Sequence, residues 1–204
     1  MGAGAFVNGV DGTLKSVNCD GRRGLLLAGA CLALLLPTAA GDAGRQLLRY
    51  DRTGLAHGQW WRLLTAHLVH LDLRHALLNA LGLALMWALF ARDYSPRAWA
   101  AILLGATAGI DAGLWLADST VGWYVGSSGV LHGVLAAGAL AKARRREWEG
   151  AVLAVLLVVK LAYEHWVGPL PLAGTAAVVV DAHLYGVLGA LAVAALLKPR
   201  PAPL

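Results

Sequence analysis

Long apolar runs separated by short polar segments dominate the pattern of this chain. Most of the runs are about 17 to 23 residues long, close to the roughly 20 residues that a helix needs to cross a bilayer. Membrane-spanning helices are therefore predicted near residues 24–40, 65–91, 97–117, 128–143, 150–167 and 175–197. We expect an all-α membrane protein with six transmembrane helices within residues 24–197, and cytoplasmic tails at 1–23 and 198–204.

The first apolar run leaves an alternative open. Arg22 and Arg23 precede the run, and its short apolar stretch at 25–36 is followed by small residues at 38–40, as in a cleavable signal peptide. We favour a first helix that is retained, with cleavage as the alternative. Residues 41–65 are mixed in polarity, and Trp60 and Trp61 favour a position at the membrane interface.

Composition agrees with lipid as the solvent, because 58% of the residues are hydrophobic and 14% are charged, against roughly 25% charged in soluble domains. The net charge is +5, but the basic residues lie in short segments between apolar runs. With a cytoplasmic N-terminus, the cytoplasmic side would hold Lys15, Arg22, Arg23, Arg92, Arg97, Lys142, Arg144, Arg145, Arg146, Lys198 and Arg200. The opposite side would hold Arg45, Arg49, Arg52, Arg62 and Arg74. This bias favours both termini in the cytoplasm and no nucleic-acid partner.

Cysteine usage predicts neither a disulfide nor a zinc site. Cys19 lies in the polar N-terminal segment and Cys31 in the first apolar run, so a bridge would have to join two environments. No CxxC pair occurs that could hold a structural zinc ion. We expect no metal and no organic cofactor.

The fourth apolar run differs from the others because it opens on a Gly-Ser-Ser-Gly cluster at 126–129 and soon meets the basic cluster at 142–146. It is too short to cross lipid by itself. A short helix with a polar start is tolerated in a membrane where other helices surround it and a water-filled cavity lies above it. Such a place suits hydrolytic chemistry.

Ser128 and His183 are the first candidates for that chemistry. Glycines on both sides of the serine pair would let a substrate carbonyl approach closely, and a helix N-terminus offers backbone N–H groups to an oxyanion. The alternative is a serine that caps a helix between tightly packed glycines. His183 should face the bundle interior, either as a hydrogen-bonded structural residue or as the base for a serine.

His75 and Asn79 are four residues apart, so they project from one face of the second span. Together they offer two convergent donors for an oxyanion. A polar clamp between helices is the alternative.

Taken together, these motifs resemble those of the rhomboid intramembrane serine proteases over about residues 60–190. The matching positions, in order, are Trp61, Arg62, His70, His75, Asn79, Gly126, Ser128, Gly129, Ala182, His183 and Gly186. The resemblance implies a six-helix rhomboid-like bundle and a catalytic dyad in which Ser128 attacks and His183 is the base. It also implies that His75, Asn79 and the Ser128 backbone N–H hold the oxyanion, and that Trp61 and Arg62 belong to a structured first loop.

His132 departs from the pattern of many rhomboids, which have a tyrosine four residues after the serine. A ring at this position would support or stack on His183, and it could also reach Ser128 as an alternative base. The string at 126–133 and the compact chain are most similar to the rhombosortase branch. That branch implies a bacterial inner membrane and membrane-anchored substrates with C-terminal Gly-Gly sorting tails.

Two acidic positions receive structural interpretations. Lys160 and Glu164 are one turn apart in the fifth span, and we expect a neutralising pair rather than catalysis. Asp181 invites a triad with His183, but residues two apart on a helix point in different directions.

The sequence therefore predicts an enzyme that cleaves a peptide bond in or beside a substrate's transmembrane helix, with the lipid bilayer as its environment. One alternative is a catalytically inactive rhomboid-like protein that binds membrane clients. Another is a metal transporter that uses His67, His70 and His75, although their spacing of three and five places them poorly on one face. An HExxH metalloprotease motif does not occur.

Overall fold

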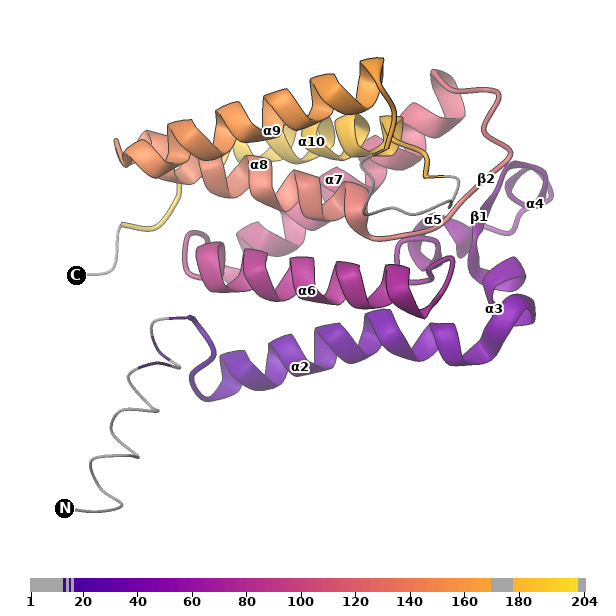
Figure 1. The fold of residues 1–204 in the computed structure, drawn as a ribbon, viewed down its shortest axis with the longest axis horizontal. Helices are drawn as coiled ribbons and strands as arrows, with labels where there is room; N and C mark the ends of the chain where they lie inside the picture. Colours follow the sequence, from indigo (N-terminus) through magenta and orange to yellow (C-terminus); the bar gives the residue numbers. More distant parts are fainter. Residues whose placement is uncertain (1–12, 14, 16, 170–177, 202–204) are drawn as a thin grey trace.

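The computed structural model describes residues 13, 15, 17–169 and 178–201 of the chain. Figure 1 shows α2 and α6 side by side, with α8, α9 and α10 on the far side of α6 and α7 crossing behind them. The longer helices are α2 (Arg22–Leu35), α6 (Leu73–Phe90), α7 (Pro96–Leu116), α8 (Ser128–Arg144), α9 (Trp148–Trp166) and α10 (Asp181–Ala194). The shorter elements are η1 (Leu36–Ala40), α3 (Gly41–Leu48), β1 (Tyr50–Asp51), α4 (Arg52–Ala56), α5 (Arg62–Thr65) and β2 (Trp123–Tyr124).

The tightest packing joins α10 to α7 and to α8. Small residues face each other there, as they do where membrane helices approach closely. A Cβ on Gly133 of α8 would lie 2.7 Å from the Gly186 carbonyl oxygen of α10, and one on Gly109 of α7 would lie 2.6 Å from the Tyr185 carbonyl oxygen. The backbones of these three helices are therefore nearly in contact, which fixes the register of α10 on α8.

Helix α8 also contacts α6, α7 and α9, and many of its residues are buried. This agrees with the expectation that a short fourth helix is surrounded by its neighbours. Because α8 packs on four helices, its N-terminal serine has a fixed position in the fold.

The predicted boundaries hold for α7, α8 and α9 but are wrong for α6. The second span was expected to begin near residue 65, whereas α6 begins at Leu73. Asp72 is the reason, because its side chain accepts a hydrogen bond from the His75 backbone N–H (2.7 Å) and caps the helix. The first residues of the expected sixth span, 175–177, lie outside the described residues, and α10 begins at Asp181.

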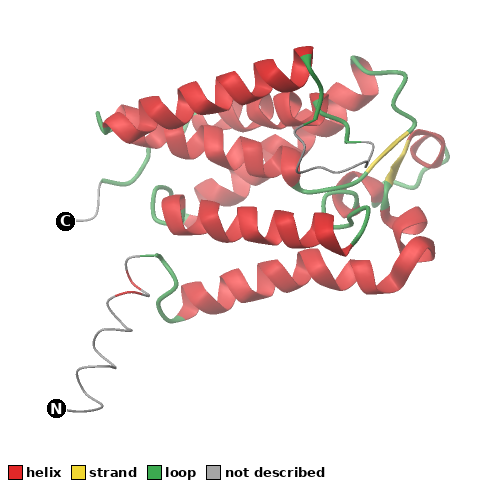
Figure 2. Cartoon of the chain, viewed as in Figure 1, coloured by secondary structure: helices red, strands yellow, loops and turns green. Residues whose placement is uncertain are grey.

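The segment between α2 and α6 folds into short helices and one strand of a two-stranded sheet. Strand β1 pairs antiparallel with β2, and Tyr50 lies opposite Tyr124. Figure 2 shows these strands together at one end of the long helices. The pairing connects the segment before α6 to the segment that leads into α8.

At the other end of the bundle, two arginine side chains form ion pairs and hydrogen bonds with neighbouring turns. Arg145, just after α8, contacts Asp93 in the α6–α7 turn (3.1 Å) and Glu147 (2.6 Å). Its hydrogen bonds hold the pKa of the Glu147 carboxyl down to about 2. Arg144 donates to the Leu197 carbonyl oxygen after α10 (2.7 Å). The α6–α7 turn, the α8–α9 turn and the end of α10 therefore share one end of the molecule.

Among the described residues, three stretches are long and apolar enough to cross a membrane: Arg22–Leu48, α6 and α7. Helix α10 is apolar but shorter. The chain thus has the composition of a multi-pass membrane protein, and its described part is mostly helical.

Candidate active site

The turn before α8 is built around Gly126. Its φ angle of +118° lies in the region that favours glycine, and its N–H donates to the Ala66 carbonyl oxygen (2.9 Å). A Cβ at this position would lie 3.0 Å from the His75 ring. The glycine thus lets the turn lie directly against the start of α6, immediately before Ser128 begins α8.

Ser128 and His183, 55 residues apart in the chain, meet where α8 and α10 cross. The Ser128 Oγ lies 3.0 Å from His183 Nε2. Glycines make this approach possible, because a Cβ on Gly129 would lie 2.6 Å from the Ala182 carbonyl oxygen and one on Gly186 would collide with the Gly129 carbonyl oxygen. The hydroxyl and the imidazole are thus within hydrogen-bonding distance.

The other ring nitrogen of His183 contacts a carboxylate. Its Nδ1 lies 2.8 Å from Oε2 of Glu164 on α9. The expected pair between Lys160 and Glu164 is present as well (2.6 Å), so the interpretation of Glu164 as half of an intrahelical pair was incomplete. The carboxylate beside Nδ1 belongs to Glu164 and not to Asp181, the residue whose position in the sequence invites a triad.

His132 lies one turn after Ser128 and stacks on His183. The ring centroids are 4.1 Å apart and the planes are inclined by 16°. Its Nδ1 lies 2.7 Å from the Ser128 carbonyl oxygen, so this nitrogen is engaged by the backbone rather than by the hydroxyl. The His132 ring therefore lies flat against the His183 ring, and its Nδ1 faces the backbone of its own helix.

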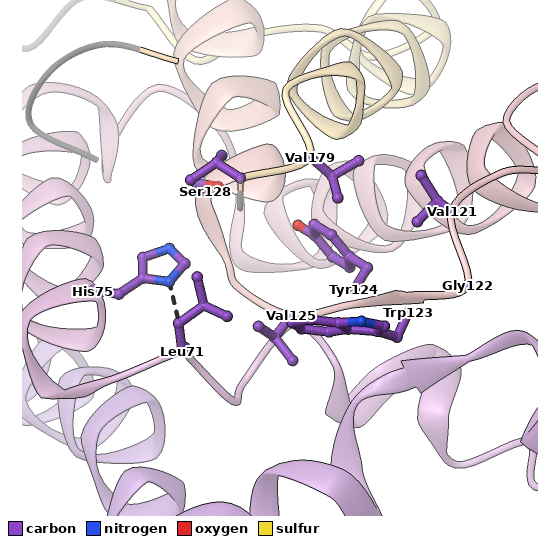
Figure 3. A pocket seen from close by; sticks show the side chains of 10 residues that line it. Leu71, His75, Val121, Gly122, Trp123, Tyr124, Val125, Ser128 and Val179 are labelled. Atoms are coloured by element: carbon purple, nitrogen blue, oxygen red, sulfur yellow. Dashed lines mark hydrogen bonds between the residues drawn. The ribbon is translucent and has the colours of Figure 1, made fainter. Parts of the chain in front are cut away.

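Ser128 also borders a cavity of about 210 Å³, and His75 forms another part of its wall (Figure 3). The Leu71 N–H lies 3.5 Å from His75 Nδ1. With Nδ1 as the acceptor of this long hydrogen bond, Nε2 would carry the proton and could act as a donor. Asn79 is buried, and its amide donates to the His75 carbonyl oxygen (3.0 Å). The cavity is lined by Leu71, His75, Val121, Gly122, Trp123, Tyr124, Val125, Ser128, Val178 and Val179.

The sequence matches the rhomboid domain family over residues 57–200, which is most of the chain. This protein belongs to the rhomboid family. The family consists largely of intramembrane serine proteases that act on membrane protein substrates within the bilayer. Comparison with curated proteins gave no match, and comparison with solved structures gave none either.

The Trp61-Arg62 pair holds the first loop of this rhomboid together. Arg62 is buried, and its guanidinium donates to the carbonyl oxygens of Gln46 and Arg49, both at 2.8 Å. The Trp61 indole donates to the Leu47 carbonyl oxygen (3.2 Å). These bonds attach the start of α5 to α3 and to the residue between α3 and β1, so both residues belong to a structured segment.

His67 and His70 of the rhomboid each have a polar partner, and the His70 ring also lies edge-on to that of His75, with ring centroids 5.1 Å apart. His67 lies 3.3 Å from Asp111 of α7, and His70 Nε2 lies 3.2 Å from the Ser127 hydroxyl. The metal-transporter alternative required His67, His70 and His75 to converge. Within the described ranges, the side chains that could together hold a metal ion are instead His132, Glu164 and His183.

Two contacts were missed from the sequence: Glu164 with His183, and Ser127 with His70. A signal for the first existed, since a carboxylate in an apolar span is costly unless it is paired and usually marks a functional site. The second had no signal, because the sequence offers His70 as a position of the family pattern and as a candidate metal ligand, and Ser127 only as the neighbour of Ser128.

Proposed function

We propose that this rhomboid is an intramembrane serine protease with Ser128 as nucleophile and His183 as base. The observation that carries the proposal is the 3.0 Å contact between Ser128 Oγ and His183 Nε2 beside a cavity that Ser128 helps to line. A serine becomes a nucleophile when an adjacent base takes its proton. Both side chains come from helices that glycine contacts hold in register.

In the proposed reaction, Ser128 Oγ attacks the carbonyl carbon of a substrate peptide bond while its proton passes to His183 Nε2. The oxyanion that forms would be held by the Ser128 backbone N–H and by His75. Asn79, which the family resemblance makes a second donor, is assigned here to the support of His75, because its amide donates to the His75 carbonyl oxygen. The C–N bond then breaks as His183 returns the proton to the leaving amine. Water activated by His183 hydrolyses the acyl-enzyme and restores the serine.

The proposed substrates are membrane-anchored proteins with Gly-Gly sorting tails, cleaved in or next to their transmembrane helix, as in the rhombosortase branch. The cavity of about 210 Å³ is smaller than the roughly 300–1,000 Å³ of typical ligand pockets, which favours small residues at the scissile bond. Glycine also lowers the cost of unwinding a helix there, by about 1 kcal/mol per residue relative to alanine.

We infer a bundle with six spans within residues 24–197 and both termini in the cytoplasm of a bacterial inner membrane. Support comes from the basic end of the molecule, where Arg144 and Arg145 join the α8–α9 turn to the α6–α7 turn and to the end of α10. Excess basic residues mark cytoplasmic loops. Ser128, at the opposite end of α8, would then face the outer half of the membrane.

The proposal is tested by a pair of variants, Ser128→Ala and Ser127→Ala, in the full chain. Each is co-expressed with a membrane protein that carries a Gly-Gly tail, and the new C-terminus of the product is identified by mass spectrometry. The purified proteins are also treated with a fluorophosphonate probe in detergent. We expect Ser128→Ala to abolish cleavage and labelling, and Ser127→Ala to retain both to within about tenfold.

Full activity in Ser128→Ala would refute the proposal. A folded wild-type protein that neither labels nor cleaves would favour the alternative, an inactive rhomboid that binds membrane clients. Labelling without cleavage of the Gly-Gly substrate would retain the protease and reject the substrate class.

A further inference from the structure

Glu164 is a buried carboxylate to which the reaction above assigns no part. It lies on α9 with 5% of its surface exposed, and both of its oxygens have partners. Oε2 is 2.8 Å from His183 Nδ1, and Oε1 is 2.6 Å from Lys160 Nζ. A buried charge is retained only where such partners offset its desolvation.

The contact with Glu164 determines which ring nitrogen of His183 carries the proton. A carboxylate only accepts hydrogen bonds, so Nδ1 must be the donor. The lone pair is then on Nε2, the atom 3.0 Å from Ser128 Oγ. This is the tautomer that can take the serine proton, and an imidazolium formed in the reaction would lie next to a negative charge.

We propose that Glu164 is a positioning residue that orients His183 and stabilises its protonated form, so that the site works as a Ser128–His183–Glu164 relay. The inference rests on the proposed function of Ser128 and His183. It extends the dyad that the family resemblance implies by a third group from α9.

Lys160 adjusts the strength of this effect. Its ammonium contacts Oε1 of Glu164, the oxygen that does not face His183. The lysine therefore offsets part of the negative charge that Glu164 places next to His183. Removing the lysine charge should therefore make the imidazolium easier to form, and removing the glutamate charge should make it harder.

Other titratable groups lie on the helices around His183. His132 stacks on it from α8, and His75 interacts with it electrostatically from α6. On α7, Asp111 is paired with His67. Among the described residues, the carboxylate in contact with His183 is therefore that of Glu164.

His132, Glu164 and His183 could also bind a cation, since their ligand atoms lie within 4.8 Å of one another. The Lys160 ammonium already occupies Oε1 of Glu164, which disfavours a second cation at the same carboxylate. Labelling rates measured with and without EDTA distinguish a metal site from the positioning role of Glu164.

The test compares Glu164→Gln with Lys160→Gln in the full-length protein in detergent. The rate of Ser128 labelling by a fluorophosphonate is measured as a function of probe concentration and pH. Glu164→Gln keeps the shape of the side chain, but its amide group can donate to Nδ1 and favour the wrong tautomer. We expect its limiting labelling rate to fall roughly 100-fold or more, with little change in the probe concentration at half-saturation.

The pH profile gives the decisive readout. The acidic limb of the labelling rate should move to lower pH in Glu164→Gln and to higher pH in Lys160→Gln, and Glu164→Asp should recover part of the rate. An acidic limb that stays in place in either variant overturns the proposal, as does a wild-type rate that depends on EDTA. If Glu164→Gln does not fold, the direction of the shift in Lys160→Gln decides.

The two proposals fail in different ways. If the wild-type protein is not labelled, or Ser128→Ala is labelled as well as the wild type, the proposed function itself fails. If Ser128 is labelled and the acidic limb of either variant coincides with that of the wild type, the relay alone is rejected.

Discussion

Ser127 and Ser128 are neighbours in the chain, and each hydroxyl lies near a histidine ring, but the two pairs have different surroundings. Ser128 lies 3.0 Å from His183, and Ser127 lies 3.2 Å from His70. The distances alone do not distinguish a catalytic pair from a structural one.

The two pairs differ in whether the serine borders the cavity and in whether a carboxylate contacts the histidine. Ser128 lines the cavity, whereas Ser127 is buried and is absent from its wall. The second nitrogen of His183 contacts the Glu164 carboxylate, and within the described segments no carboxylate forms an ion pair with His70. A nucleophilic serine needs both an open approach and a base held in one tautomer. The Ser128 pair has the cavity and the carboxylate contact on which the proposed mechanism depends.

Replacing the two histidines gives the largest expected contrast. His183→Gln should lower the fluorophosphonate labelling rate by at least about 1000-fold, since loss of the base is among the most costly changes in a serine protease. His70→Gln should lower it by less than about tenfold, because His70 supports the turn before α8 through Ser127. Labelling by purified protein at fixed pH measures both. The reverse order would assign the chemistry to the Ser127 pair.

The proposed oxyanion donors, His75 and Asn79, extend the comparison to the cavity. His75 borders the same cavity as Ser128, whereas the Asn79 amide already donates to the His75 carbonyl oxygen. We expect His75→Ala to lower the limiting labelling rate by roughly 100- to 1000-fold, the usual loss for one oxyanion donor. Asn79→Ala should cost about tenfold through the position of His75. Equal losses would show that both side chains contact the oxyanion directly.

Some of this site could be predicted from the sequence because the signals are local. The glycine-flanked serine, the apolar runs of α7 to α9 and the family order of motifs all lie within short stretches. The expected approach of Ser128 to His183 is present at 3.0 Å, and the catalytic roles stay predictions. Asp72 is a typical N-cap residue and could have predicted the start of α6, but the apolar run that begins near residue 65 favoured an earlier start.

The contact between Glu164 and His183 could not be predicted in this way. Spacing along α9 identifies Lys160 as a neighbour of Glu164, but it gives no information about the rotation of α9 relative to α10. That rotation depends on how α8 packs against both helices. The packing of helices that are far apart in the sequence therefore decides whether a carboxylate such as Glu164 contacts only a lysine of its own helix or also the histidine of the candidate active site.

The glycine contact between α8 and α10 offers a way to disturb one serine pair and leave the other in place. A methyl group on Gly186 would collide with the Gly129 carbonyl oxygen, so Gly186→Ala should push α10 away from α8 and lengthen the Ser128–His183 contact. A misplacement of about 1 Å can cost roughly 100-fold in rate. The Ser127–His70 pair does not involve α10 and should stay in place.

Gly29→Ala is the matched control for this change. A Cβ on Gly29 of α2 meets nothing within 4 Å, and alanine is the better helix former by about 1 kcal/mol. We therefore expect Gly186→Ala to lose roughly 100-fold in labelling and to lower the thermal unfolding midpoint, while Gly29→Ala changes neither for the worse. Wild-type labelling and stability in Gly186→Ala would mean that the glycine contact does not hold Ser128 and His183 together, since the two helices would then tolerate an added methyl group between them.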